Sequence, residues 1–147
     1  MLRELINYTR VADKKAIATF LSADKAMPQA EALFSHILNA QDIWISRVKG
    51  IKPRFERFDV HAVNEFSKIH EANMVEIEEI LATVNLETII SYSTFSGESF
   101  KDPLKDILLH VANHSTYHRA QVASQFKLNN VEPPVTDFIA LKRERSI

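Results

Sequence analysis

The sequence predicts an all-α fold: a four-helix bundle with a small β-hairpin before the fourth long helix and a short C-terminal helix. Two observations favour this fold. Apolar residues recur at three- and four-residue steps along four long stretches of the 147-residue chain, as they do in helices that bury one face. The only glycines are Gly50 and Gly97, which excludes the glycine-rich motifs of a Rossmann fold or a P-loop. We expect residues 1–147 to form a single domain.

The first two helices are predicted over residues 2–23 and from Pro28 to just before Gly50. Proline suits the first turn of a helix, and glycine suits its end. The residues that define their apolar stripes are Leu2, Leu5, Ile6, Ala12, Ala16 and Phe20 in the first helix and Ala30, Leu33, Ile37, Ala40, Trp44 and Val48 in the second. The loop over residues 49–59 carries arginine, proline and phenylalanine, and it could cover the mouth of a pocket.

The third helix is expected over about residues 60–84. His70 and Asn73 interrupt its apolar stripe, and buried polar groups are costly unless they are paired. These two residues therefore line a wet cavity, pair with neighbouring helices or lie at an oligomer interface. His61, near the start of this helix, has no such company and is predicted at the surface.

Between residues 87 and 101 the pattern changes to alternation, and Ser96-Gly97 supplies a turn, which predicts a β-hairpin. Asp102 and Pro103 are expected to be the N-cap and the first turn of the fourth helix. This helix continues to about residue 127 and ends at Asn129-Asn130. After an extended Pro133-Pro134 segment, Thr136 and Asp137 can cap a short last helix.

The composition excludes several classes of function. The 18 Lys and Arg residues nearly balance the 19 Asp and Glu residues, and no basic block stands out, so nucleic acid is not an expected partner. The absence of cysteine removes disulfides, thiolate ligands and a cysteine nucleophile. No signal peptide and no apolar run of membrane-spanning length are present, so we expect a cytoplasmic protein without a membrane partner. A chain of this length needs no metal merely to fold, so any metal is expected to be functional.

Three histidines, His110, His114 and His118, follow one another at four-residue steps within the predicted fourth helix. Each step turns the helix by only about 40°, so two neighbours can bind one ion. The apolar stripe of this helix directs His114 and His118 inward, with Gln121 beside them, whereas His110 lies further round. His110 is therefore better placed as a neighbour of a metal than as its ligand. The alternative is that these histidines are hydrogen-bonded polar residues at a helix interface.

His36 lies on the flank of the second helix, on the same side as Arg47. This position suits a third ligand, although a single histidine on a helix flank is more often just a partly exposed side chain. The pair of histidines on the fourth helix favours the ligand interpretation. His70 is the runner-up ligand.

Two segments, LFSHILNAQDIWISRV at 33–48 and HVANHSTYHRAQV at 110–122, resemble the DinB/YfiT-like family of metal-dependent bacterial proteins. The resemblance covers nearly the whole chain, including the four long helices and the hairpin. In that family one histidine of the second helix and two of the fourth bind a divalent metal, which implies His36, His114 and His118 as ligands. Ala120 departs from the family, which often has glycine there, but this position concerns helix packing and not ligation.

The resemblance implies a metal-dependent enzyme with a small-molecule substrate, either a thiol S-transferase that uses a low-molecular-weight thiol or a hydrolase. Zinc or nickel is the first expectation for the metal, with iron or manganese next, and relatives commonly form homodimers. No Asp or Glu stands near the histidines of the fourth helix as a general base, which weakens the hydrolase version. His110 is the spare candidate base, and Arg47 and Gln121 are candidate contacts to the ligands or the substrate. A non-catalytic bundle that binds a metal or a small ligand, and a plain interaction module, remain alternatives.

Overall fold

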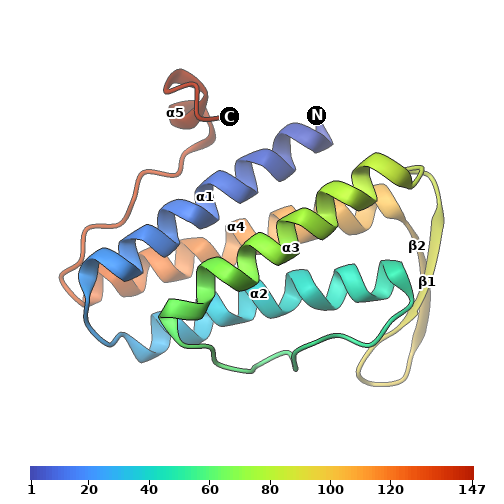
Figure 1. Ribbon diagram of the computed structural model, residues 1–147, viewed down its shortest axis with the longest axis horizontal. Coiled ribbons are helices and arrows are strands. Elements are labelled where there is room, and N and C mark those ends of the chain that lie inside the picture. The colour runs from blue at the N-terminus through green and yellow to red at the C-terminus, as the bar shows by residue number, and fades with distance from the viewer.

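The computed structural model describes all 147 residues, and most of them are helical. In chain order the elements are α1 (Leu2–Ala23), α2 (Pro28–Lys49), α3 (Val63–Thr83), β1 (Ile89–Ser93), β2 (Ser99–Pro103), α4 (Leu104–Leu128) and α5 (Phe138–Arg143) (Figure 1). The two strands form one small antiparallel sheet, in which Tyr92 pairs with Phe100. No helix combines the length and the apolar character needed to cross a membrane.

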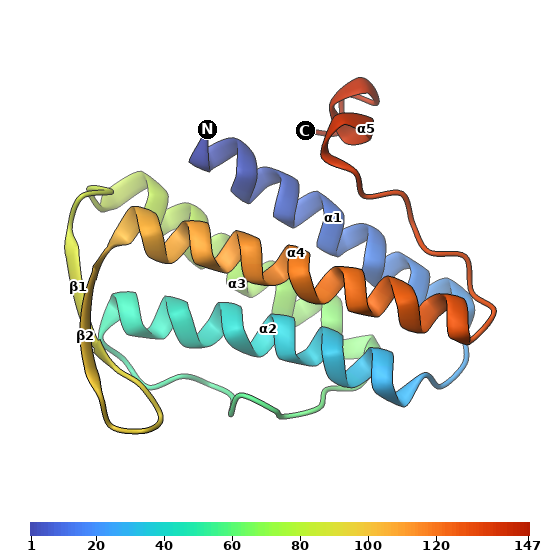
Figure 2. The ribbon, with the colours of Figure 1, turned by 180° about the vertical axis from the view of Figure 1, so that it is seen from behind.

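The four long helices run side by side (Figure 1 and, from behind, Figure 2). Helix α4 packs against α1 and α2, and helix α3 packs against the same two helices. The hairpin lies across one end of this arrangement and contacts both α2 and α4. Strand β2 leads directly into α4, so the start of this helix lies at the hairpin end of the molecule.

The apolar core has two main parts. One part, toward the hairpin, includes the fully buried residues Ile77, Leu104 and Ala112. The other part contains the rings of Phe20, Phe34, Phe66 and Phe126, whose contacting centroids lie 4.8–5.5 Å apart. Edge-to-face and tilted pairs at such distances stabilise a core beyond their buried area. These rings come from all four long helices, so they hold the far end of the molecule together.

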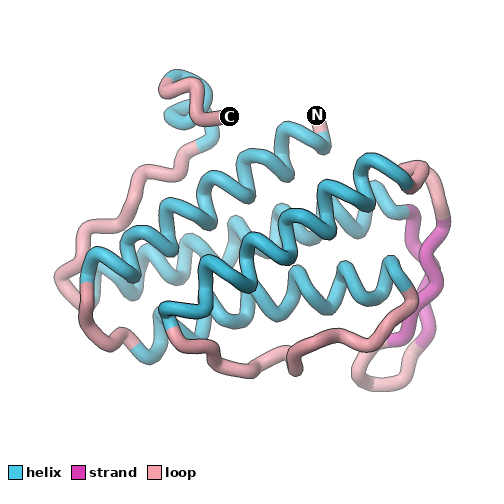
Figure 3. Tube along the Cα trace, viewed as in Figure 1, coloured by secondary structure: helices cyan, strands magenta, loops and turns pink.

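Helix α3 begins at Val63, three residues later than the sequence predicted, because residues 60–62 belong to the α2–α3 loop (residues 50–62). The backbone N–H of His61 donates a hydrogen bond to Ser35 Oγ at 3.0 Å, and Ala62 is extended. Figure 3 shows this loop returning along α2 toward the start of α3. The prediction that His61 lies at the surface is wrong, because its ring is half-buried and its Nε2 lies 2.6 Å from Asn39 Oδ1.

The predicted start of α4 is also wrong. Asp102 is a residue of β2 opposite Ile90, and its carboxylate accepts a hydrogen bond from the Tyr92 hydroxyl at 2.6 Å. Because this carboxylate is engaged across the hairpin, it does not cap the helix, which begins at Leu104 without a side-chain cap. Asp137 does precede α5, but its side chain forms no capping hydrogen bond.

A buried polar network crosses the middle of the four helices and consists of Asp13, Gln41, His70, Asn73 and Arg119. Arg119 Nη1 donates to Asp13 Oδ1 at 2.7 Å, and Gln41 Nε2 donates to Asp13 Oδ2 at 2.9 Å. Asn73 Nδ2 donates to Gln41 Oε1 at 3.2 Å and to the Leu38 carbonyl at 3.0 Å. Of the three alternatives, the structure therefore selects pairing with a neighbouring helix for Asn73, whereas His70 Nε2 is buried 3.4 Å from Asp13 Oδ2 without a hydrogen bond.

Candidate metal centre

The packing of α2 on α4 brings three histidines together. His36 of α2 and His114 and His118 of α4 each offer a ring nitrogen, and these nitrogens lie within 4.8 Å of one another. The ring centroids are 4.4 Å apart for His114 and His118, 4.7 Å for His36 and His118, and 5.0 Å for His36 and His114. All three side chains are half-buried. We call this group the three-histidine cluster.

Two of these rings are held by oxygen atoms that can only accept a hydrogen bond. His36 Nδ1 lies 3.0 Å from the backbone carbonyl of Arg57, and His118 Nδ1 lies 2.7 Å from Gln121 Oε1. Each Nδ1 must therefore carry the hydrogen, which leaves the lone pair on Nε2. Anchoring of the distant nitrogen by a carbonyl is how metal-binding histidines are usually oriented. Both rings are thus held in the form in which Nε2 can bind a cation.

The charge state of the cluster suits the same role. Burial lowers the pKa of His114 to about 4, and the neighbouring charges of His118, His36 and His110 act in the same direction. Burial also lowers the pKa of His36, against the effect of its hydrogen bond to the Arg57 carbonyl. Both rings are neutral at pH 7, and the neutral imidazole is the form that binds metals.

The donor set fits a divalent transition metal. Imidazole nitrogens suit zinc, copper, iron and nickel, whereas magnesium and calcium prefer oxygen ligands. The cluster contains three histidines and no carboxylate. Three protein ligands leave a coordination position open, as in catalytic zinc sites, while structural zinc sites use four.

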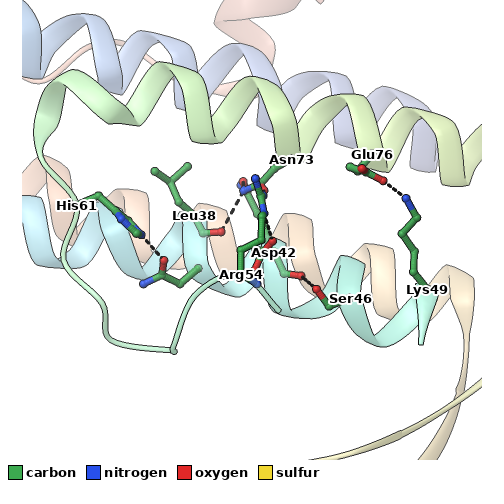
Figure 4. Close-up of polar contacts among 10 residues, drawn as sticks. Leu38, Asp42, Ser46, Lys49, Arg54, His61, Asn73 and Glu76 are labelled. Carbon is green, nitrogen blue, oxygen red and sulfur yellow. Dashed lines mark hydrogen bonds and ion pairs between the residues drawn. The ribbon is translucent and has the colours of Figure 1, made fainter. Parts of the chain in front are cut away.

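The α2–α3 loop is fixed to the helices beneath it, and this fixing places the Arg57 carbonyl at His36. Arg54 donates from its backbone N–H and its Nε to the two oxygens of Asp42, at 2.8 and 2.7 Å, and from Nη2 to Asn73 Oδ1 at 2.6 Å. Asn39 Nδ2 donates to the Asp59 carbonyl at 2.8 Å. Figure 4 shows Arg54 between Asp42 and Asn73, together with the contact made by His61. The loop thereby connects the buried polar network to the three-histidine cluster.

An open cavity of about 370 Å³ lies beside the cluster. Its walls come from α2, the α2–α3 loop, the tip of the hairpin and α4. They are made by His36, Ala40, Ile43, Trp44, Arg47, Arg57, Thr94, Phe95, Ser96 and His114. A cavity of this size is suited to a small metabolite and not to a polymer.

The remaining predicted residues lie in different places. Gln121 accepts the hydrogen bond of His118, and Arg47 stacks over Trp44 at 4.4 Å, at the cavity wall. His110 is exposed, with its ring centroid 5.7 Å from that of His114, and it is not a member of the three-histidine cluster. Loss of hydration and the charge of Arg47 lower the pKa of His110. This residue can therefore act as a neutral base next to the cluster.

The runner-up prediction of His70 as a ligand is wrong. His70 lies on α3, which packs against α1 and α2, whereas the three-histidine cluster lies between α2 and α4. Its Nε2 lies 3.4 Å from Asp13 Oδ2 instead.

Helical periodicity did not indicate Arg57, Phe95 or the pair Asp13 and Arg119 as functional residues. Arg57 and Phe95 lie in a loop and a hairpin tip, where no helical periodicity exists to indicate a direction. Asp13 and Arg119 could have been found, because they fall at apolar-stripe spacing from Ala16 and Val122, where an unpaired charge is costly.

A sequence model of the DinB family matches residues 12–146, nearly the whole chain. The searches of curated proteins and of solved structures found no match to the chain. The matched range contains α2 and α4 and therefore all three histidines of the cluster. The chain belongs to the DinB family.

Proposed function

We propose that the protein is a metal-dependent enzyme that binds one divalent metal ion. The ligands are Nε2 of His36, Nε2 of His118 and a ring nitrogen of His114. The observation that carries this proposal is the pair of Nδ1 hydrogen bonds, to the Arg57 carbonyl and to Gln121 Oε1. These bonds prepare two rings for coordination, which a merely solvated histidine does not need. The pairwise packing of the four long helices also supports the inference that the scaffold is a four-helix bundle.

We further propose transfer of a thiol to a small electrophile as the reaction. A divalent metal bound there supplies positive charge that lowers the pKa of a thiol or water ligand. His110, whose pKa is lowered, accepts the thiol proton, so that the sulfur attacks the electrophile as a thiolate and a sulfur–carbon bond forms. The electrophile either takes up the proton at the neighbouring atom or releases its leaving group. Trp44 and Phe95 line the cavity and offer apolar surface to the reacting groups.

Hydrolysis is the second candidate reaction. It is favoured by the coordination position that three histidines leave open, because this position can hold the attacking water. It is disfavoured by the cavity walls, which contain no carboxylate that could act as general base.

Metal content tests the binding step. Purified protein without a tag, supplied with zinc or nickel during growth, is expected to contain one metal ion per chain. His118→Ala is expected to lose it, whereas His110→Ala is the matched control and is expected to retain it. Retention of metal by His118→Ala would contradict the assignment of ligands.

Activity tests the chemical step. Metal-loaded protein is expected to accelerate the reaction of 2-mercaptoethanol with a chromogenic electrophile, and His118→Ala is expected to lose this acceleration. If instead a chromogenic ester is cleaved and no thiol conjugate forms, the hydrolase reaction replaces the transferase reaction.

A further inference from the structure

We infer that the cavity beside the three-histidine cluster binds a small organic anion, with a carboxylate or phosphate held between Arg47 and Arg57. This inference deepens the proposed function and rests on it for the second contact of the ligand, which is the metal. Anion binding by the two arginines is a separate property and can be measured without metal.

The charge of the cavity walls has one sign. Arg47 and Arg57 are the only residues among the wall residues that carry a charge at pH 7, and no aspartate or glutamate faces the cavity. Any charge on the wall histidines, His36 and His114, would also be positive. A divalent metal at the cluster would add further positive charge. Every charged group of the cavity walls therefore attracts an anionic ligand.

Neither guanidinium has a hydrogen-bond acceptor or an ion-pair partner within the protein. Arg47 and Arg57 donate no side-chain hydrogen bond and form no ion pair, although each guanidinium has five N–H donors. Two other arginines differ in this respect, because Arg54 pairs with Asp42 and Arg119 pairs with Asp13. Burial lowers the pKa of Arg47, so this cation is partly removed from water without a protein anion to compensate.

Aromatic rings hold both guanidinium groups in position. Arg47 Cζ lies 4.4 Å from the Trp44 ring centroid and 5.6 Å from that of Phe95, and Arg57 Cζ lies 5.2 Å from the same Phe95 ring. Arg57 also lies 4.6 Å from the Phe58 ring. Stacking uses the flat faces of a guanidinium and leaves its N–H edges free for bidentate contacts to carboxylate or phosphate. Both arginines thus meet at one ring of the hairpin tip, at the mouth of the cavity.

The dimensions and walls of the cavity define the ligand class. About 370 Å³ holds a molecule of metabolite size. Ile43, Trp44 and Phe95 offer apolar wall surface for a short carbon skeleton. The ligand is therefore a compact molecule with an oxyanion at one end and a metal-binding group at the other.

Binding of simple probes to the full chain tests this inference. Succinate, inorganic phosphate and the uncharged analogue succinamide are titrated into metal-free and zinc-loaded protein, and the Nε–Hε signals of arginine side chains are followed by NMR. Succinate, phosphate or both are expected to shift the signals of Arg47 and Arg57, and succinamide is not. Comparison of succinate with phosphate shows whether a carboxylate or a phosphate is preferred.

Three variants assign the effect to residues. Arg47→Gln and Arg57→Gln are each expected to weaken binding of the preferred anion by about tenfold, the scale expected for loss of a bidentate ion pair. Arg57→Gln keeps the backbone carbonyl that holds His36, so metal content is expected to stay unchanged. Arg143→Gln is the matched control, because this exposed arginine of α5 also has no ion pair but lies outside the cavity.

The outcomes for this inference and for the proposed function are distinguishable. If the protein fails to bind zinc or nickel but the preferred anion still shifts the NMR signals of Arg47 and Arg57, the anion site stands and the proposed metal enzyme fails. If zinc binds but succinamide shifts these signals as strongly as the anions do, the anion site is overturned. The same holds if neither anion moves either signal at millimolar concentration, or if Arg143→Gln weakens binding as much as Arg47→Gln.

Discussion

The molecule contains two groups of partly or fully buried histidines and polar side chains, and they are built in opposite ways. In the buried polar network, His70 faces the Asp13 carboxylate at 3.4 Å, and Asp13 also pairs with Arg119. In the three-histidine cluster, no carboxylate is present and each ring has other histidines as neighbours. The network contains the ion pair of Asp13 and Arg119, whereas the cluster brings three ring nitrogens within 4.8 Å of one another without an opposite charge.

The group that contacts the imidazole ring distinguishes a ligand histidine from a structural one. Burial does not separate them, because His70 is more deeply buried than any member of the cluster. The contact partner of the ring does differ between the two kinds of histidine. A carbonyl oxygen at Nδ1, as for His36 and His118, prepares Nε2 for a cation, whereas Nε2 of His70 already faces a carboxylate at 3.4 Å.

The largest effect is expected from removing the anion of the network. Asp13→Ala leaves Arg119 buried without a counter-ion, and loss of one partner of a buried ion pair typically costs about 3–5 kcal/mol. Denaturant unfolding measures this loss. The control is Glu78→Gln, which removes an exposed pair with Arg10 and is expected to cost less than about 1 kcal/mol. Equal effects of the two variants would show that the network does not stabilise the fold.

A smaller effect is expected from loosening one ring of the cluster. Gln121→Ala removes the acceptor of His118 Nδ1, and loss of such a contact typically lowers metal affinity about 10–100-fold. Competition with a chelator of known affinity measures the change. Gln125→Ala, one turn further along α4, makes no such contact and is the matched control. If the metal affinity of Gln121→Ala were unchanged, the hydrogen bond of Gln121 would not be needed to orient His118 for metal binding.

The network also predicts a dependence of stability on pH. Burial raises the pKa of Asp13, but the charge of Arg119 and the contact with His70 outweigh burial, so the pKa lies below its usual value. Such a group stabilises the fold fully above the pKa of an unfolded aspartate, about 3.9, and this contribution is lost as the pH falls below that value.

Asp13→Asn, which cannot titrate at this position, tests that dependence. Its unfolding free energy is expected to fall less steeply with acid than that of the wild type, by at most about 1.4 kcal/mol per pH unit for one proton. Urea unfolding between neutral pH and the acid limit of the fold measures both slopes. Parallel slopes would show that Asp13 is not the titrating group.

The smallest effect is expected from the α2–α3 loop that connects the two regions. Arg54→Gln removes the ion pair with Asp42 and loosens the loop that carries the Arg57 carbonyl to His36. Metal affinity is expected to fall a few-fold, less than in Gln121→Ala, because the loop keeps its bonds to Asn39. Faster amide exchange within residues 51–61 is expected alongside. A loop that exchanges faster without any change in metal affinity would separate the loop from the cluster.

The sequence by itself determined the helices and their faces, because apolar periodicity is local and each buried face must be covered. Four-residue spacing placed His114 and His118 together on one face, and the resemblance to the DinB family added His36. The structure confirms that these three residues meet. The hairpin was also predicted, since alternation and a Ser-Gly turn are local signals.

Only the tertiary structure decided what each polar side chain contacts. The carbonyl at His36 comes from a loop 21 residues further along the chain, and the carboxylate that faces His70 comes from α1. Asp102 was expected as a helix cap but is engaged by Tyr92 across the hairpin. Loops carry no periodicity, and a hydrogen bond depends on distances of a few ångströms between distant segments. For this reason the sequence could nominate the three histidines, whereas the prepared nitrogens and the two unpaired arginines emerged only from the packed chain.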